Sequence, residues 1–310
     1  MKKVFIDGSA GTTGLRIYER LEGRRDIGLI KLSEELRKDN AARAEALNTA
    51  DIAFLCLPDA AAVEAVGMIT NPDTCVIDTS TAHRTAEGWA YGFAELTGYD
   101  EIKASKRIAN PGCHASGFVA LIAPLIREGI VSKNEMLSAF SLTGYSGGGK
   151  KMIAEYEGEG RNPLLDAPRM YGLTQKHKHL PEMVKVCGLA NAPAFCPIVA
   201  DFYSGMEVTV PLFANAINGT IKDIEDIYSA YYNNGSGLVR FEKEAGEEGF
   251  MSAAAYSGRD DMEVSVTGND ERILLVSRFD NLGKGASGAA IQNLNILMGA
   301  EETAGLNIGK

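Results

Sequence analysis

The sequence predicts two domains: a Rossmann-like, doubly wound α/β domain with a parallel sheet, then an α+β domain with an antiparallel or mixed sheet. The chain has 310 residues, whereas single hydrophobic cores usually stop growing near ~250 residues. Wholly apolar strands alternate with helices in the first third, which is typical of a parallel sheet covered on both faces. Beyond about residue 135, a hairpin and long loops replace this alternation.

Apolar runs and helical spacing define the elements of the first domain. The predicted strands are 4–6, 27–32, 52–57 and 74–78, and the predicted helices are 15–21, 41–47 and 60–68. Pro58 ends the third strand. A strongly apolar helix is expected from Ala115 onward, directly after an Asn-Pro-Gly turn.

The second domain shows alternation typical of half-buried strands. We expect strands over 137–145, 206–214 and 238–241, an amphipathic helix over 221–232, and a hairpin that joins 263–267 to 272–277. Residues 146–179 are polar and glycine-rich with little periodicity, which predicts an irregular segment. A last helix is expected within 283–299.

Composition excludes several classes of protein. The net charge of −10 and the pI near 5.1 argue against nucleic acid as a partner. No apolar run approaches the ~20 residues that span a bilayer, and the N-terminus runs directly into a strand, which leaves no room for a signal peptide. The five cysteines are odd in number and show no C-x-x-C spacing, which argues against disulfides and zinc. We therefore expect a reduced, cytoplasmic protein without a membrane partner.

A glycine-rich turn follows the first predicted strand and precedes the first predicted helix. Its pattern is G-x-x-G-x-x-G, a variant of the dinucleotide-binding loop, which needs positive φ, close backbone approach to pyrophosphate and a helix N-terminus. The residues predicted to bind the cofactor here are Gly8, Ser9, Gly11, Thr12, Thr13 and Gly14. A purely structural turn is the alternative.

The tip of the second strand bears on the choice of cofactor. An NAD-specific fold usually carries Asp or Glu there, whereas this chain has Ser33, with Arg37 and Lys38 following. Ser33 and Arg37 favour a 2′-phosphate and hence NADP(H). Glu34 keeps NAD as the alternative.

Cys113 differs from the other four cysteines, which lie in apolar surroundings typical of inert buried thiols. It follows the Asn110-Pro111-Gly112 turn and falls at or near a helix N-terminus, at the carboxyl edge of the parallel sheet. A helix dipole favours thiolate at such a place, and open α/β sheets bind ligands at that edge. Cys113 is therefore the predicted nucleophile of an acylating aldehyde dehydrogenase.

Histidine is the expected acid/base, since its pKa lies near neutrality. His114 adjoins the nucleophile and is read as structural, and His83 lies on the loop after the fourth strand. His177 and His179 share one face of an extended segment and could enter one cleft together. A metal site of these two histidines with Glu182 is the alternative, but no further carboxylate or thiol cluster supports it, so no metal is predicted.

The order of these motifs resembles the N-acetyl-γ-glutamyl-phosphate reductases, in particular their shorter second type, within the aspartate-semialdehyde dehydrogenase superfamily. The resemblance runs essentially end to end, and Asn-Pro-Gly-Cys with Lys-His-x-His-x-Pro-Glu is its most specific part. Matching stretches are 8–14, 91–96, 110–117, 145–151, 176–182 and 280–288. One departure concerns Asp78-Thr79-Ser80-Thr81-Ala82-His83-Arg84, where longer members have Asp-Leu-Ser-Ala-Asp-Phe-Arg.

The resemblance implies a reaction: Cys113 attacks an acyl phosphate, phosphate leaves, and NADPH reduces the thioester to N-acetylglutamate 5-semialdehyde, as in arginine biosynthesis. It also implies that His179 or His177 is the acid/base, with His179 preferred, and that Tyr171 and Glu182 orient the imidazoles. The substrate-binding residues implied are Arg84, Ser80, Asn110, Tyr171, Glu182 and Lys150, and Asn281 and Gly285 are implied to contact the cofactor. A solvated loop lysine is the alternative for Lys150.

The resemblance further implies the domain limits. The cofactor domain covers 1–115 and is completed by 284–310, and the catalytic and dimerisation domain covers 116–283. A homo-oligomer, dimer or tetramer, is expected. Competing functions are an aspartate-semialdehyde dehydrogenase or another phosphorylating aldehyde dehydrogenase, and a non-catalytic NADP-sensing protein. A substrate one methylene longer would be poorly discriminated.

Overall fold

The computed structural model describes residues 1–309, and the chain divides into two compact units. The first consists of Met1–Pro111 and Ala286–Leu306, and the second of Gly112–Gly285 and residues 307–309. Among the described residues, no helix is both long and apolar enough to cross a membrane.

The first unit is built on a six-stranded parallel sheet with the order β2-β1-β3-β4-β6-β5. The strands are β1 (Lys2–Asp7), β2 (Ile27–Ile30), β3 (Ile52–Leu55), β4 (Cys75–Asp78), β5 (Ala90–Tyr91) and β6 (Arg107–Ala109). The chain leaves β1 toward β2 on one side, and β3 lies on the other, so the order reverses at β1. Ligands bind open α/β sheets at such a switch point, and the glycine loop follows β1 there.

Helices cover both faces of this sheet, as the apolar strands predict. One core packs α1 (Thr12–Leu21) and α10 (Gly288–Met298) against Ile6 and Phe54. The opposite core packs α2 (Asn40–Thr49) and α3 (Asp59–Gly67) against Ala53 and Leu55. Two short helices, α4 (Ala94–Thr97) and α5 (Tyr99–Ala104), precede β6.

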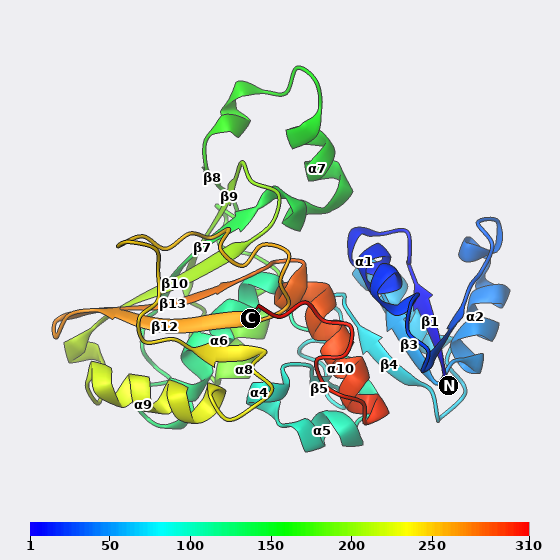
Figure 1. The fold of residues 1–310 in the computed structure, drawn as a ribbon, viewed down its shortest axis with the longest axis horizontal. Coiled ribbons are helices and arrows are strands. Elements are labelled where there is room, and N and C mark those ends of the chain that lie inside the picture. Colours follow the sequence, from blue (N-terminus) through cyan, green and yellow to red (C-terminus); the bar gives the residue numbers. More distant parts are fainter. Residues whose placement is uncertain (310) are drawn as a thin grey trace. The chain divides into compact units, whose positions relative to one another are not determined.

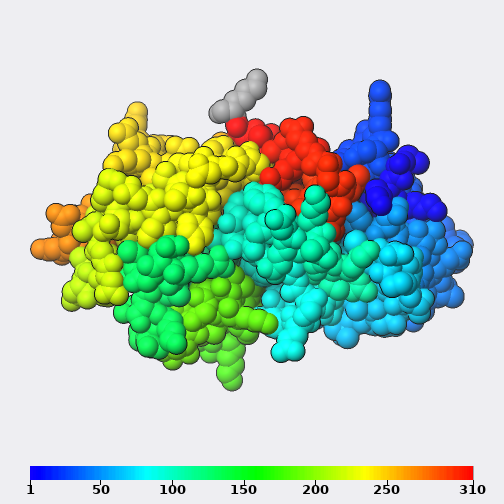
Figure 2. Space-filling model, turned by 90° about the horizontal axis from the view of Figure 1, so that it is seen from below, coloured from blue at the N-terminus to red at the C-terminus, as the bar shows by residue number. Residues whose placement is uncertain are grey.

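The C-terminal segment belongs to this first unit although it is distant in sequence. The Arg24 guanidinium donates to the Asn295 side chain at 2.5 Å, and α10 packs on α1 and α5. In the space-filling view, the red C-terminal segment lies beside the blue and cyan residues of the same unit (Figure 2). The predicted last helix is confirmed as α10, preceded by a single π turn over Gly283–Ser287.

The second unit contains a seven-stranded mixed sheet with the order β11-β12-β13-β10-β7-β9-β8 (Figure 1). Its strands are β7 (Ser138–Gly144), β8 (Arg169–Met170), β9 (Ala194–Ala200), β10 (Met206–Phe213), β11 (Val239–Phe241), β12 (Met262–Gly268) and β13 (Arg272–Phe279). The predicted hairpin is confirmed as β12 and β13, which pair antiparallel. Both domain classes are therefore as predicted.

One face of the second sheet is covered by helices. The apolar helix α6 (Cys113–Arg127) crosses it, and Gly117 lies so close that a Cβ there would come within 2.5 Å of Val208. Helices α8 (Leu180–Cys187) and α9 (Ile221–Tyr232) pack on α6. The expectation of an irregular segment over 146–179 is partly wrong, because α7 (Gly149–Glu157) forms within it.

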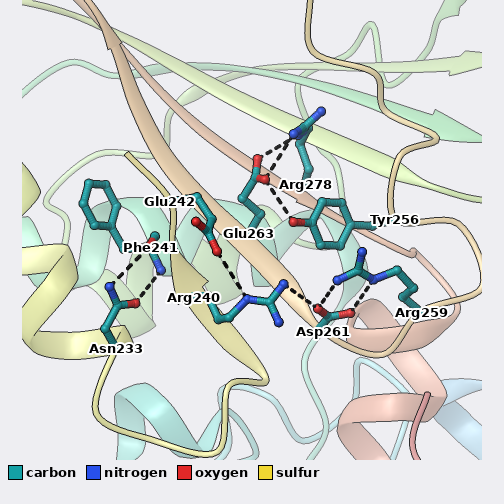
Figure 3. Close-up of polar contacts among 9 residues, drawn as sticks. All are labelled: Asn233, Arg240, Phe241, Glu242, Tyr256, Arg259, Asp261, Glu263 and Arg278. Atoms are coloured by element: carbon teal, nitrogen blue, oxygen red, sulfur yellow. Dashed lines mark hydrogen bonds and ion pairs between the residues drawn. The ribbon is translucent and has the colours of Figure 1, made fainter. Parts of the chain in front are cut away.

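The β11–β12–β13 edge of this sheet carries a polar network (Figure 3). Arg278 is 2% exposed and donates from Nε to Glu263 Oε1 at 2.8 Å, while the Tyr256 hydroxyl donates to the other oxygen of Glu263 at 2.9 Å. Arg240 pairs with buried Asp261 at 3.1 Å. Buried charges are tolerated because each is paired and hydrogen-bonded, which accounts for the many charged side chains inside this edge.

Candidate active site

The glycine loop has the backbone that the sequence pattern predicts. Gly8 has φ of +87°, and a Cβ there would lie 2.3 Å from the Cys56 carbonyl oxygen. A Cβ on Gly14 would lie 2.4 Å from the Gly8 carbonyl oxygen. Gly11 is the N-cap of α1, so Thr12 is the first residue of that helix and Thr13 the second. Larger side chains cannot occupy Gly8 or Gly14 without moving the backbone.

A cavity of about 810 Å³ lies at this loop. Its lining includes Gly8, Ser9 and Gly11 from the loop and Arg37 from the segment after β2. Thr12, Thr13, Gly14 and Ser33 are not among its lining residues. The volume and the loop backbone fit the phosphate-bearing half of a dinucleotide.

Four cations line the same cavity, and three of them already have carboxylate partners. Arg37 pairs with Glu34 at 2.9 Å, and Lys31 pairs with Glu22 at 3.2 Å. Arg43 is the third, and it pairs with Asp7 at 3.0 Å. Lys38 is the remaining one, and no described carboxylate lies within ion-pair distance of it. It stands next to Arg37, which the sequence predicts to bind the cofactor.

Arg43 and Asp7 form a buried ion pair that sequence reasoning missed. Asp7 is the last residue of β1, and its Oδ2 lies 3.0 Å from Arg43 Nη2 of α2. Both are less than a tenth exposed, and both line the cavity. An arginine inside a predicted helix carries no sequence signal of this pairing.

Ser80, Arg84 and Asn110 are brought together at the carboxyl edge of the first unit's sheet. Arg84 donates from Nε to the Asn110 carbonyl at 2.9 Å and from Nη2 to the Thr79 carbonyl at 3.1 Å. These two bonds orient the guanidinium. The Asn110 side chain is buried and donates to the Ala286 carbonyl at 3.0 Å.

Ser80 is bound to a buried carboxylate. Asp78 accepts from the Ser80 backbone at 2.9 Å and from its hydroxyl at 2.7 Å. His83 Nδ1 lies 2.6 Å from the same carboxylate, and its ring stacks on Trp89 at 4.0 Å. These contacts shape the loop that carries Arg84.

Cys113 is the first residue of α6, with Gly112 as the N-cap. The prediction that it lies at a helix N-terminus is confirmed. Gly285 lies against it, since a Cβ on Gly285 would come within 3.0 Å of Cys113 Cβ. Glu182 of α8 is buried, and its Oε1 accepts from the Gly112 backbone N–H at 2.8 Å. The turn before Cys113 is thus held by a side chain distant in sequence.

Three histidines and a tyrosine gather beside Cys113. His114 Nδ1 lies 2.7 Å from the Ser141 hydroxyl of β7, and its Nε2 lies 2.6 Å from the Tyr171 hydroxyl. The His114 ring centroid lies 5.5 Å from that of His177 and 5.6 Å from that of His179. The structure therefore brings His177, His179 and Tyr171 together as predicted, with His114 at the centre.

Burial separates the chemistry of these groups. It lowers the pKa of His114 to about 3, with positive charge at His177 and Lys178 adding to the effect. It also lowers the pKa of His177, helped by Lys178, and raises the pKa of Tyr171, helped by negative charge at Cys113. His114 and His177 are therefore neutral imidazoles near pH 7.

A local fold presents His177 and His179. Gln175 has φ of +55°, and its side chain makes two hydrogen bonds with the backbone of Phe195, at 2.7 and 2.8 Å. The His179 backbone N–H donates to His177 Nδ1 at 3.2 Å, which places the proton of the neutral His177 ring on Nε2. His179 itself is the N-cap of α8 and is buried.

The remaining predicted residues lie elsewhere in the second unit. Lys150 is exposed on α7, in the excursion beyond β7 and β9 (Figure 1). Asn281 accepts from the Gly205 backbone N–H at 2.9 Å and donates to Ser146 at 3.1 Å. Among the described residues, no group of three or more His, Cys, Asp or Glu side chains could hold a metal ion.

Each of the two units contains most of a region that matches a domain of known proteins. Residues 3–105 match the NAD binding domain of semialdehyde dehydrogenases, and residues 113–281 match their dimerisation domain. Aspartate semialdehyde dehydrogenase II from Vibrio cholerae has a similar fold, with a TM-score of 0.71 at 16% identity over 96% of this chain and 98% of that one. The enzyme from Candida albicans, solved with NADP, gives a TM-score of 0.62 at 15% identity and the same coverage.

Closer relatives share the whole length. A protein of a Chelativorans species named N-acetyl-gamma-glutamyl-phosphate reductase is 45% identical over 96% of this chain and 98% of its own. A Nostoc protein named N-acetyl-gamma-glutamyl-phosphate reductase 2 is 43% identical over 98% and 99%, and one from Pseudomonas putida with that name is 40% identical over 97% and 98%.

The two domains and the cysteine at the head of α6 define an oxidoreductase of the semialdehyde dehydrogenase class with an NAD(P)-binding domain. Within that class the chain belongs to the N-acetyl-γ-glutamyl-phosphate reductase family. The resemblance stated from the motifs is thereby confirmed.

Proposed function

We propose that the protein reduces N-acetyl-γ-glutamyl phosphate to N-acetyl-L-glutamate 5-semialdehyde and phosphate with NADPH, in arginine biosynthesis. The observation that carries this proposal is Cys113 at the first position of α6, beside a cluster of imidazoles, in a chain 40–45% identical to reductases of that name. We propose that the first unit binds the cofactor and that the second carries catalysis.

The chemistry begins at sulfur. The Cys113 thiolate attacks the acyl carbon, a C–S bond forms, and the bond from that carbon to the phosphate oxygen breaks, so phosphate leaves and a thioester remains on Cys113. The α6 N-terminus stabilises the thiolate before attack. Gly8, Gly11, Arg37 and Lys38 of the first unit would hold NADPH. The cofactor would supply a hydride to the thioester carbon, and the Cys113 sulfur would leave that carbon as thiolate.

His179 is the proposed acid/base. His177 Nδ1 is occupied by the His179 backbone N–H, so its neutral ring carries its proton on Nε2 and is a donor there. Protonation of His177 would break this bond, which favours His179 as the group that takes the thiol proton and delivers it to the departing phosphate. His177 is proposed to donate a hydrogen bond to substrate.

The anionic substrate requires cations and donors. Arg84 is proposed to bind substrate carboxylate or phosphate, because two backbone carbonyls fix its guanidinium. Asn110, Tyr171 and Lys150 remain proposed substrate ligands. The hydroxyl of Ser80 donates to Asp78, so its proposed contribution is to shape the Arg84 loop.

Replacing Cys113 with serine tests the reaction. NADPH oxidation with the acyl phosphate should vanish in C113S while NADPH binding by fluorescence stays within about twofold. Mass spectrometry of the native enzyme, given acyl phosphate without NADPH, should show a thioester on Cys113. Full activity of C113S, or equal or better turnover of β-aspartyl phosphate than of the proposed substrate, would refute the proposal. The homologue one methylene longer serves as the probe of substrate length.

We propose that the protein is a homo-oligomer that uses the open face of the second sheet. Helices cover one face, whereas the other exposes apolar side chains, among them Phe140 at 45% and Leu274 at 39%. A second copy is the proposed partner because the matched family domain is a dimerisation domain. F140D should lower the mass measured by light scattering to that of one chain, and an unchanged oligomer would contradict this assignment.

The proposed compartment is the cytoplasm. All five cysteines are free thiols in the structure, and reducing compartments keep thiols in that state.

A further inference from the structure

Glu182 lies where two helices begin. It is the third residue of α8, and its Oε1 accepts from the backbone N–H of Gly112, the N-cap of α6. Only 1% of Glu182 is exposed. A carboxylate is favoured at helix N-termini, and Glu182 lies at the N-terminal ends of both α8 and α6.

The contact bears on the geometry of the nucleophile. Gly112 immediately precedes Cys113, and the following residue, His114, is held by Ser141 and Tyr171. The backbone around Cys113 is therefore fixed on both sides by polar side chains of three separate segments. Glu182 is the only one of these that acts on the residue before the nucleophile.

The contact also bears on charge. The N-terminus of α6 favours thiolate at Cys113, whereas a carboxylate at the same terminus opposes a second negative charge. Removal of the Glu182 charge is therefore expected to favour the thiolate form of Cys113.

We propose that Glu182 is a positioning residue for Cys113: its carboxylate holds the Gly112 N–H, and thereby sets the orientation of the sulfur and restrains its ionisation. This inference rests on the proposed function at one point only, namely that the Cys113 sulfur is the nucleophile. In this proposal the Glu182 carboxylate binds the backbone N–H of Gly112 and does not bind substrate.

Alkylation of Cys113 by iodoacetamide, followed by mass spectrometry of its peptide, tests the proposal without substrate. In E182Q the amide oxygen still accepts from Gly112 while the charge is gone, so alkylation at pH 7 should be about tenfold faster, with kcat within about fivefold of the native value. In E182A the hydrogen bond is lost as well, and kcat should fall about 100-fold. KM for NADPH should stay unchanged in both.

E155Q, which removes one exposed charge of α7, is the matched control and should alter neither readout. Native alkylation rates in both Glu182 variants would overturn the proposal. So would an E182Q enzyme as inactive as E182A, since that result would place the carboxylate on substrate. Because alkylation requires no acyl phosphate, these outcomes remain distinct from a failure of the proposed reaction.

Discussion

Three histidines within a few ångströms of one another have different environments in the second unit. His114 uses both ring nitrogens for Ser141 and Tyr171, and burial lowers its pKa to about 3. His177 is half-buried, and its Nδ1 accepts from the backbone. The residue next to Cys113 is thus a neutral link in a hydrogen-bond chain, which leaves His177 and His179 as the proposed groups for proton transfer.

Lys38 is the residue that we expect to decide cofactor preference. It lines the cavity at the glycine loop, and no described carboxylate pairs with it, whereas Glu34 already pairs with Arg37. The 2′-phosphate of NADPH would form an ion pair with the Lys38 ammonium. K38M should raise the Kd for NADPH about tenfold or more and leave that for NADH within about twofold, as measured by fluorescence titration.

R37M is the matched control for that measurement. Part of the Arg37 charge is already compensated by Glu34, so the loss in R37M should be smaller than in K38M. A larger loss of NADPH affinity in R37M than in K38M would indicate that Arg37, the residue predicted from the sequence, binds the 2′-phosphate.

Among the elements, α6 contains a proline that leaves one carbonyl in need of a donor. Pro124 has no N–H, so the Ala120 carbonyl lacks its helical partner. The Tyr232 hydroxyl of α9 donates to that carbonyl at 2.6 Å, and Tyr228 donates to the neighbouring Leu121 carbonyl at 2.5 Å. Helix α9 therefore completes the hydrogen bonding of α6 while packing on it.

Y232F should destabilise the protein, because the buried Ala120 carbonyl would be left without a partner. The expected loss of unfolding free energy is about 1–3 kcal/mol, measured as a shift of the urea midpoint at constant slope. Y228F is the control and should cost less, since Leu125 N–H still reaches the Leu121 carbonyl in a regular helix. Equal losses in the two variants would show that the proline plays no part.

For the whole molecule, His114 makes stability depend on pH. Its folded pKa of about 3 lies below the unfolded value of 6.5, so below pH 6.5 the unfolded chain binds more protons. Stability should therefore fall as pH decreases from 6.5 toward 3, by about 1.4 kcal/mol per pH unit from this group.

H114Q removes that contribution. Its urea midpoint should be lower than native at pH 7, because contacts with Ser141 and Tyr171 are weakened, but should decline less steeply between pH 6.5 and 4.5. Parallel pH profiles for the two proteins would contradict the assignment of a neutral buried His114.

Much of the fold could be predicted because its signals are local. Apolar strands alternating with helices define the parallel sheet, and the helix over 221–232 is α9 residue for residue. The prediction of an irregular segment over 146–179 failed at α7 because glycines at its start hide a short helix. The strand β9 was not predicted, since its pairing with β7 and not its own pattern defines it.

The sequence by itself determined the class of protein, the glycine loop and the cysteine at the head of a helix, since these depend on residues a few positions apart. Only the tertiary structure decided which distant side chains contact these local features. Glu182 reaches Gly112 across 70 positions, and Arg43 reaches Asp7 across 36. Such contacts depend on strand register and helix packing, which bring distant residues together after local structure has formed.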